Sequence, residues 1–384
     1  MAKKPVLNMR YYNHEIDDDL PYVGQLKLDK KTGYIRISSF GQKTHEEFLA
    51  KLDSLQKQGM KDMILDLQSN GGGLLQASVD IANEFLNQSE LIVYTQGRVF
   101  PRYDYLAKGG GRFNKGRVAV LIDQNTASAA EILSGAIQDW DRGVIVGRRS
   151  FGKGLVQQPI EFNDGSAIRL TIARYYTPSG RCIQKPYVKG KDEKYEMDII
   201  TRYEHGEFFS QDSIMQDERQ IYYTSLGRPV YGGGGIMPDI FVPQDTTGYT
   251  SYFSMAINQR LTQKFAFQYT DQNRQKLQKY ENADDLLKYL KTQNILEKFA
   301  RYAESKGLKR RNILMYKSKE LFDRNLYGNI IYNMLNMEEY VKYINQSDKT
   351  VLKALEVLEA EKAFPNAPEE KSEASHERTE TTVA

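Results

Sequence analysis

A serine lies at the point where an apolar strand gives way to a helix. Residues 118–122 form a continuous apolar run typical of a buried strand, and helical spacing begins just beyond Ser128. A helix N-terminus presents unpaired N–H groups and the positive end of the helix dipole, which can stabilise an oxyanion. Ser128 is therefore a candidate nucleophile, with the N–H of Ala129 as a candidate oxyanion donor. A plain N-cap serine fits the same position.

A lysine between two glycines follows the apolar strand 143–147. If a new strand begins at about Lys153, its period of two places Lys153, Leu155 and Gln157 on one face. In apolar surroundings the pKa of the amine would fall, and the neutral amine could take the proton of a serine hydroxyl while Gln157 holds it in position. A phosphate-binding loop is disfavoured because Gly154 stands where that loop needs Ser or Thr.

Three consecutive glycines, Gly71, Gly72 and Gly73, follow the short apolar strand 63–67. Glycine permits positive φ and leaves its N–H group uncovered. One of the three could supply a second oxyanion donor beside the N–H of Ala129. An ordinary strand-to-helix turn would have the same composition.

These three segments, in this order, resemble the carboxyl-terminal processing (tail-specific) serine peptidases. The hallmarks of that family are a D-L-R-x-N-x-G-G turn, an S-A-S-A-S-E nucleophile segment and an F-G-K-G loop followed by a glutamine. They correspond here to Asp66–Gly73, Thr126–Glu131 and Phe151–Gly154 with Gln157. Segments 174–181 and 235–239 match as well, so that the resemblance covers about residues 23–245. Each motif alone is a weak signal, but five in order are very specific.

The resemblance implies an α/β fold of the ClpP/crotonase type. It also implies a dyad of Ser128 and Lys153, with Gln157 orienting the lysine and an oxyanion hole formed by Ala129 and a glycine N–H. Gly72 is the first choice for that glycine and Gly73 the next. The expected activity is that of a serine endopeptidase, which cleaves unfolded or C-terminal segments of proteins through an acyl-enzyme. No cofactor or metal is expected, and the expected location is the periplasm or cell envelope.

The sequence departs from the family pattern at four positions. Gln68 and Gly71 stand where Arg and Pro are usual, and Thr126 and Ala130 replace serines that flank the nucleophile. None of these positions belongs to the dyad. The glycine at position 71 leaves the register of the oxyanion turn open.

Strand-like and helix-like segments alternate through the first two thirds of the chain, which predicts an α/β domain with helices packed on a sheet. From Tyr249 onward glycine becomes rare, and amphipathic helical patterns recur at 283–289, 296–302 and 351–358. We therefore expect a linker or remnant of a preceding domain at 1–22, the catalytic domain at 23–245, a helical C-terminal region at 246–362 and a disordered tail at 363–384. Family members usually carry an N-terminal PDZ domain, for which 22 residues are too few.

Composition narrows the other possibilities. The net charge of +3 arises from interspersed acids and bases, which disfavours a nucleic-acid partner. The four histidines and the single cysteine, Cys182, show no metal-ligand spacing. The sequence shows neither the apolar run of a signal peptide nor that of a transmembrane helix. The expected partners are protein or peptide substrates, and the oligomeric state stays open.

Two other functions are compatible with the expected fold. A non-catalytic relative that binds peptides or hydrophobic ligands would lack the serine or the lysine, and both are present. An acyl-CoA enzyme of the crotonase type would need a pair of glutamates and contacts for adenine and phosphate, which no segment of the sequence indicates.

Overall fold

The first part of the chain is built on a six-stranded sheet. The computed structural model describes residues 23–28, 31–187, 193, 195, 197–215 and 219–360, so the expected linker at 1–22 and tail at 363–384 lie outside the described residues. The strand order is β1-β2-β3-β6-β7-β12, with β1 antiparallel to β2 and every other pair parallel. The strands are β1 (Val23–Lys27), β2 (Thr32–Ile37), β3 (Asp62–Asp66), β6 (Val118–Ile122), β7 (Val144–Gly147) and β12 (Ile240–Phe241).

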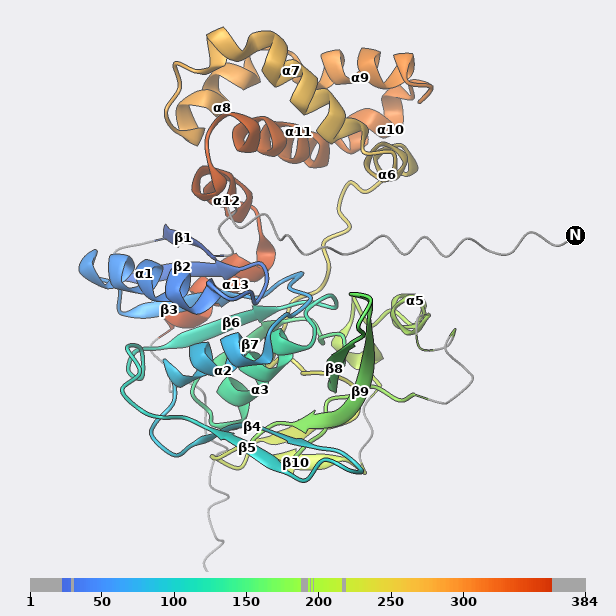
Figure 1. Cartoon of the computed structure of the whole chain (residues 1–384). Helices are drawn as coiled ribbons and strands as arrows, with labels where there is room; N and C mark the ends of the chain where they lie inside the picture. The colour runs from blue at the N-terminus through green and yellow to red at the C-terminus, as the bar shows by residue number, and fades with distance from the viewer. Residues whose placement is uncertain are drawn as a thin grey trace, which may run out of the picture.

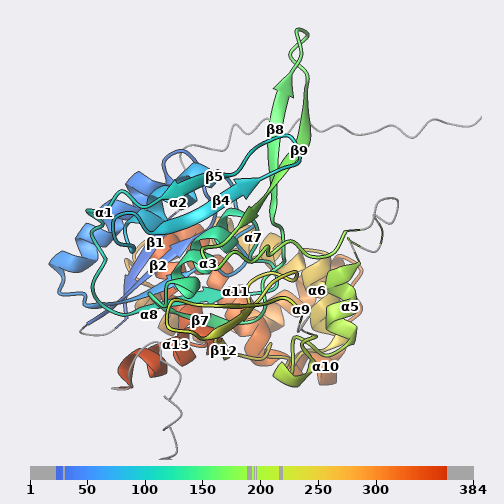
Figure 2. The ribbon, with the colours of Figure 1, turned by 90° about the horizontal axis from the view of Figure 1, so that it is seen from below.

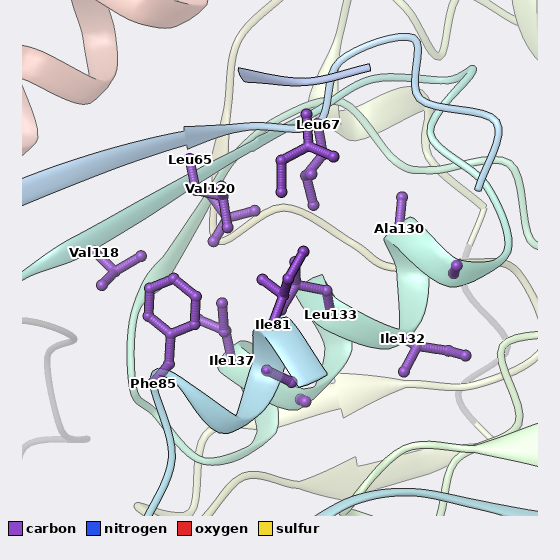
Figure 3. Close-up of a cluster of buried hydrophobic side chains, with 14 of the residues drawn as sticks. Leu65, Leu67, Ile81, Phe85, Val118, Val120, Ala130, Ile132, Leu133 and Ile137 are labelled. Atoms are coloured by element: carbon purple, nitrogen blue, oxygen red, sulfur yellow. The ribbon is translucent and has the colours of Figure 1, made fainter. Parts of the chain in front are cut away.

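The central strands β3, β6 and β7 are buried along their whole length, which explains their continuous apolar sequences. On one face of the sheet pack α1 (Thr44–Lys57), α2 (Leu75–Asn83) and α3 (Ala129–Asp139), with which the sheet forms the main core. Figure 3 shows Ile81 of α2 and Leu133 and Ile137 of α3 gathered near Leu65 and Val120 of the sheet.

A second sheet has four antiparallel strands in the order β5-β4-β9-β8. The strands are β4 (Leu91–Gln96), β5 (Tyr103–Leu106), β8 (Leu155–Glu161) and β9 (Ala167–Tyr176). The far part of the β8–β9 hairpin is exposed and projects from the body of the molecule (Figure 2). A short pair, β10 (Ile221–Tyr223) with β11 (Pro229–Tyr231), and the helix α5 (Asp198–Glu204) complete this half.

The C-terminal part is helical, as expected. Its larger bundle has a core of its own and includes long helices such as α7 and α11 (Figure 1). Among the described residues no helix is both long and apolar enough to cross a membrane. The helices are α6 (Ser251–Asn258), α7 (Leu261–Leu277), α8 (Ala283–Lys291), α9 (Ile295–Ser305), α10 (Asn312–Lys317), α11 (Lys319–Met334), α12 (Met337–Asn345) and α13 (Lys349–Glu359).

The last helix returns to the sheet. Val351, Ala354 and Leu358 of α13 pack with Ile64 and Leu121 on the sheet face opposite α1–α3. The six-stranded sheet is thus covered on both faces, by early helices on one side and by the end of the helical region on the other (Figure 1). The predicted α/β core and helical C-terminal region are confirmed, while the exact domain boundaries stay a prediction.

Candidate active site

Three parallel neighbours, β3, β6 and β7, end at the same edge of the sheet, and each leads into one of the predicted motifs. The hydroxyl of Thr126 donates to the carbonyl of Leu67 at 2.8 Å, and the N–H of Ala127 donates to the carbonyl of Asn70 at 2.9 Å. The N–H of Phe151 donates to the carbonyl of Thr126 at 2.9 Å. The glycine turn, the nucleophile segment and the lysine loop therefore form one cluster.

Ser128 is the residue directly before α3, and its backbone conformation is unusual. Its φ of 59° and ψ of −119° lie outside the regions that a serine ordinarily adopts, including the extended conformation of an N-cap. Such a conformation costs on the order of 1–3 kcal/mol and persists only where the surroundings impose it. Strained residues of this kind cluster at functional sites, which favours a nucleophile over a plain cap.

The buried carboxylate of Glu131 imposes this conformation and joins two of the motifs. Its Oε2 accepts the backbone N–H groups of Ser128 and Lys153, each at 2.8 Å. Its Oε1 accepts the N–H of Gly152 at 2.7 Å and the hydroxyl of Ser150. Burial raises the pKa of Glu131, and these four hydrogen bonds oppose the rise. Glu131 thus holds the backbone of the serine beside the backbone of the lysine.

The glycine turn lies directly against the serine. A Cβ on Gly72 would come within 2.6 Å of the Cβ of Ser128 and 2.9 Å of the nitrogen of Ala129, and Gly72 has a φ of 95°. No other residue fits there. The N–H of Gly72 donates to Oδ1 of Asn70 at 2.8 Å. Among the described residues no acceptor binds the N–H of Gly73 or that of Ala129, so these two groups are free to bind an oxyanion.

Lys153 lies in the loop before β8 and is half-buried. Strand β8 begins at Leu155, two residues after Lys153. The loop continues because Gly152 has a φ of 85° and because the backbone of Gly154 packs against Gln184, whose Oε1 accepts its N–H at 2.9 Å. In the described part of the chain, the Lys153 amine has no hydrogen-bond or ion-pair partner.

Tyr175 forms a second link between the serine and the lysine. This side chain of β9 is only 2% exposed, and its hydroxyl donates to the backbone carbonyl of Lys153. The hydroxyl also interacts with the side chain of Ser128. Burial and the negative charge of Glu131 raise the pKa of Tyr175 well above its ordinary value, so its hydroxyl keeps its proton. Tyr175 therefore holds the lysine loop at the serine from the side of the second sheet.

The predicted orienting residue, Gln157, lies exposed on β8 opposite Thr171. Among the described residues no hydrogen bond joins it to Lys153. The glutamine that contacts the lysine loop is Gln184, which accepts the Gly154 N–H and donates to the carbonyl of Lys185 at 2.8 Å. The role assigned to Gln157 stays a prediction.

A second lysine lies behind the same loop. Lys185 is 3% exposed, lies over the rings of Phe151 at 3.9 Å and Tyr195 at 4.3 Å, and pairs with Asp198 at 3.2 Å. Its burial lowers its pKa, although Asp198 opposes this. The pairing with Asp198 distinguishes Lys185 from Lys153, whose amine has no partner among the residues that the structure describes.

The two further motifs support the site from outside. In the 235–239 segment, the N–H of Ile236 donates to the hydroxyl of Ser150 at 2.6 Å, and Ser150 in turn donates to Glu131. In the 174–181 segment, the fully buried guanidinium of Arg181 binds Asp139 of α3 at 2.7 Å. Both motifs therefore position the loop of Lys153 and the helix of Ser128.

Sequence reasoning did not assign roles to Glu131 or Tyr175. The signal for Glu131 was present, since Ser128 and Glu131 have the S-x-x-E spacing of a capping box. Tyr175 belongs to a matched motif, but its contact with the site depends on how the second sheet packs. Among the described residues no group of three His, Cys, Asp or Glu side chains could hold a metal ion.

Two families match different parts of the chain. Residues 31–193 match peptidase family S41. This range includes every residue of the cluster described above except the supporting segment 235–239. Residues 252–336, within the helical region, match a family of unknown function, DUF8443.

Curated proteins match the same part of the chain. A carboxyl-terminal-processing protease of Synechocystis sp. is 42% identical over 187 residues, which are 49% of this chain and 42% of that protein. The carboxy-terminal processing protease CtpA of Bacillus subtilis is 35% identical over 161 residues, 42% of this chain and 34% of that protein. The chain thus spans less than half the length of these relatives. Among solved structures, a photosystem II D1 C-terminal processing protease is 28% identical, with a TM-score of 0.41, over 56% of this chain and 43% of that one.

Proposed function

Because the chain carries a peptidase family S41 domain at residues 31–193, we propose that it is a serine endopeptidase with Ser128 as nucleophile and Lys153 as general base. The same match confirms the expected ClpP/crotonase-type core. The observation that carries the assignment is the shared carboxylate oxygen of Glu131, which holds the backbones of Ser128 and Lys153 side by side. The substrates are proteins or peptides, in keeping with the processing proteases that match the chain.

The proposed reaction uses the free groups of the cluster. The neutral amine of Lys153 takes the proton of the Ser128 hydroxyl as its oxygen attacks the scissile carbonyl carbon. The oxyanion that forms accepts the N–H of Ala129 and one glycine N–H. The protonated lysine then gives its proton to the leaving amine, and a water molecule, activated by the same amine, hydrolyses the acyl-enzyme.

The choice of glycine differs from the first expectation. Gly72 is the residue that must be glycine for Ser128 to fit, but its N–H is already bound by Asn70. Gly73 follows directly and has a free N–H among the described residues. These facts favour Gly73 as donor and Gly72 as the residue that makes room for the serine.

The test of this function is proteolysis of an unfolded protein such as casein by the full chain and by its Ser128→Ala variant. Loss of the nucleophile is expected to lower kcat by at least about 10³-fold. Ser134→Ala, on the same helix but bonded to the carbonyl of Ala130, is the matched control and should keep its activity. Equal cleavage by the wild type and Ser128→Ala would exclude Ser128 as the nucleophile. Absence of cleavage by folded wild-type protein would favour the non-catalytic, ligand-binding alternative.

The finer assignments belong to the same proposal. We propose cleavage within unfolded or C-terminal segments; the C-terminal part of this proposal is supported by the names of the matched proteins, which are bacterial and chloroplast C-terminal processing proteases. A periplasmic or cell-envelope location is our proposal from the same relationship. Fractionation of the producing cells, followed by immunodetection of the protein, would test the location directly.

A further inference from the structure

A pocket of about 350 Å³ lies in the helical region between α7 and α9, outside the peptidase domain. Figure 1 shows these two helices in the bundle beyond the catalytic half. Phe265 and Tyr269, one turn apart on α7, line it from one side. Lys298, Arg301 and Tyr302, at the corresponding spacing on α9, line it from the other.

The aromatic part of the pocket contains an unsatisfied hydroxyl. The ring of Phe265 lies 5.8 Å from that of Tyr269 and 5.6 Å from that of Tyr302, measured between centroids. Among the described residues the buried hydroxyl of Tyr269 has no hydrogen-bond partner, and burial raises its pKa to about 12. Buried hydroxyls normally have a partner, so this side chain, which lines the pocket, leaves one hydrogen bond unmade.

Two cations at this pocket have no ion-pair partner in the described part of the chain. Among the described residues no carboxylate lies within ion-pair distance of Lys298 or Arg301, and the Lys298 ammonium lies 5.3 Å from the centroid of the Tyr269 ring. The positive charge of Arg301 contributes to lowering the pKa of Glu297, but both carboxylate oxygens of Glu297 already accept hydrogen bonds from Arg310. The pocket lining includes no acidic residue. The pocket is therefore positively charged at its edge and aromatic inside.

We propose that this pocket binds a peptide carboxylate that adjoins an aromatic or aliphatic side chain. Lys298 and Arg301 bind the carboxylate, which a guanidinium can hold through two parallel hydrogen bonds. The rings of Phe265, Tyr269 and Tyr302 receive the apolar side chain.

Exposed amides favour a peptide over a simple anion. Gln268 and Gln272 line the α7 side of the pocket, and each side-chain amide can both donate to and accept from a peptide backbone. The proposal gives a function to the region that matches a family of unknown function, and it is independent of the peptidase chemistry.

The experiment measures binding rather than cleavage. A fluorescein-labelled pentapeptide, Ala-Ala-Leu-Ala-Phe, is titrated with the full chain in the Ser128→Ala background, which prevents turnover, and fluorescence anisotropy gives Kd. The free acid should bind at least about tenfold more tightly than the same peptide with an amidated C-terminus, because the amide carries no charge. A third peptide, amidated but with Glu in place of the last Ala, tests a side-chain carboxylate. If it binds like the free acid, the pocket takes carboxylates of either origin; if it binds like the amide, the pocket takes the terminal one.

Variants locate the binding in this pocket. Lys298→Gln and Arg301→Gln should each weaken binding of the acid by about fivefold or more, with unchanged circular dichroism. Lys309→Gln, which removes an exposed lysine outside the pocket, should leave Kd unchanged. Equal affinity for acid and uncharged amide would overturn the proposal. So would undiminished binding by the folded Lys298→Gln, Arg301→Gln double variant, since the carboxylate would then bind elsewhere.

Discussion

Oε2 of Glu131 accepts the backbone N–H of Lys153 at 2.8 Å, so the helix that begins after Ser128 also holds the loop of Lys153. The same oxygen accepts the N–H of Ser128 at the same distance. The geometry of the proposed dyad therefore depends on a residue that need not touch the substrate.

Lys153→Arg should be nearly as inactive as Lys153→Ala. Arginine stays protonated at every accessible pH and cannot accept the serine proton, and loss of a general base typically lowers the rate by ~10²–10⁴-fold. The readout is kcat on a fluorogenic peptide. A double variant, His45→Gln with His205→Gln, is the control. It should stay within about tenfold of wild type, since His45 pairs with the remote Glu84 and His205 ends α5. Substantial activity in Lys153→Arg would mean that this lysine acts through its charge.

Tyr175→Phe should lower kcat by about tenfold and leave KM nearly unchanged. The variant loses only the hydroxyl that binds the Lys153 carbonyl and the Ser128 side chain, and one hydrogen bond contributes up to about tenfold. Tyr176→Phe is the matched control, because Tyr176 stacks on Tyr94 at 4.8 Å, away from the dyad. Equal kinetics for both variants and wild type would reduce Tyr175 to a packing residue.

Glu131→Gln should lower kcat by ~10- to 100-fold, because an amide nitrogen cannot accept the N–H bonds that a carboxylate oxygen accepts. Burial raises the pKa of Glu131 above 4.5. The two proteins are therefore compared at alkaline pH, where Glu131 of the wild type is a carboxylate, with a fluorogenic peptide as substrate.

The exposed Glu46→Gln on α1 serves as control and should keep the wild-type kcat. An unchanged kcat in folded Glu131→Gln would show that the proposed dyad does not depend on this carboxylate.

Glu207→Gln should destabilise the protein at neutral pH more than in acid. Burial raises the pKa of Glu207, but Arg149 and Arg202 outweigh this and hold it below 4.5. A lowered pKa in the folded state gives stability that is present above pH 4.5 and is lost as pH falls through the folded value. We expect a loss of about 2 kcal/mol at pH 7, measured by urea unfolding, and a smaller one at pH 3. If the variant lost the same free energy of unfolding at pH 3 as at pH 7, the stabilising role of the charged Glu207 would be contradicted.

The core strands and the clustering of the motifs could be predicted from the sequence, because both follow from local patterns. Continuous apolar runs identified β3, β6 and β7, and parallel strands that end at one edge bring their following turns together. The sequence also predicted that the glycine turn lies beside Ser128, and Gly72 does pack closely against this serine.

What the sequence did not reveal depends on packing between distant segments. Tyr175 reaches the site because β9 pairs with β8 and β4, and no local pattern specifies that pairing. The apolar stripe of α13 predicted a buried helix face but not which surface it buries. The pattern of residues around Lys153 indicated a strand there, but not that β8 begins only at Leu155, after the turn at Gly152.

The return of α13 to the sheet has a consequence for protein synthesis. All strands of the six-stranded sheet have been translated once residue 241 leaves the ribosome, but residues 349–359, which cover its second face, emerge about a hundred residues later. During that interval the nascent sheet exposes apolar side chains such as Ile64, Leu121 and Val146. Such surfaces recruit chaperones or aggregate. A chain whose synthesis terminates before α13 therefore contains both residues of the proposed dyad but has an uncovered sheet face.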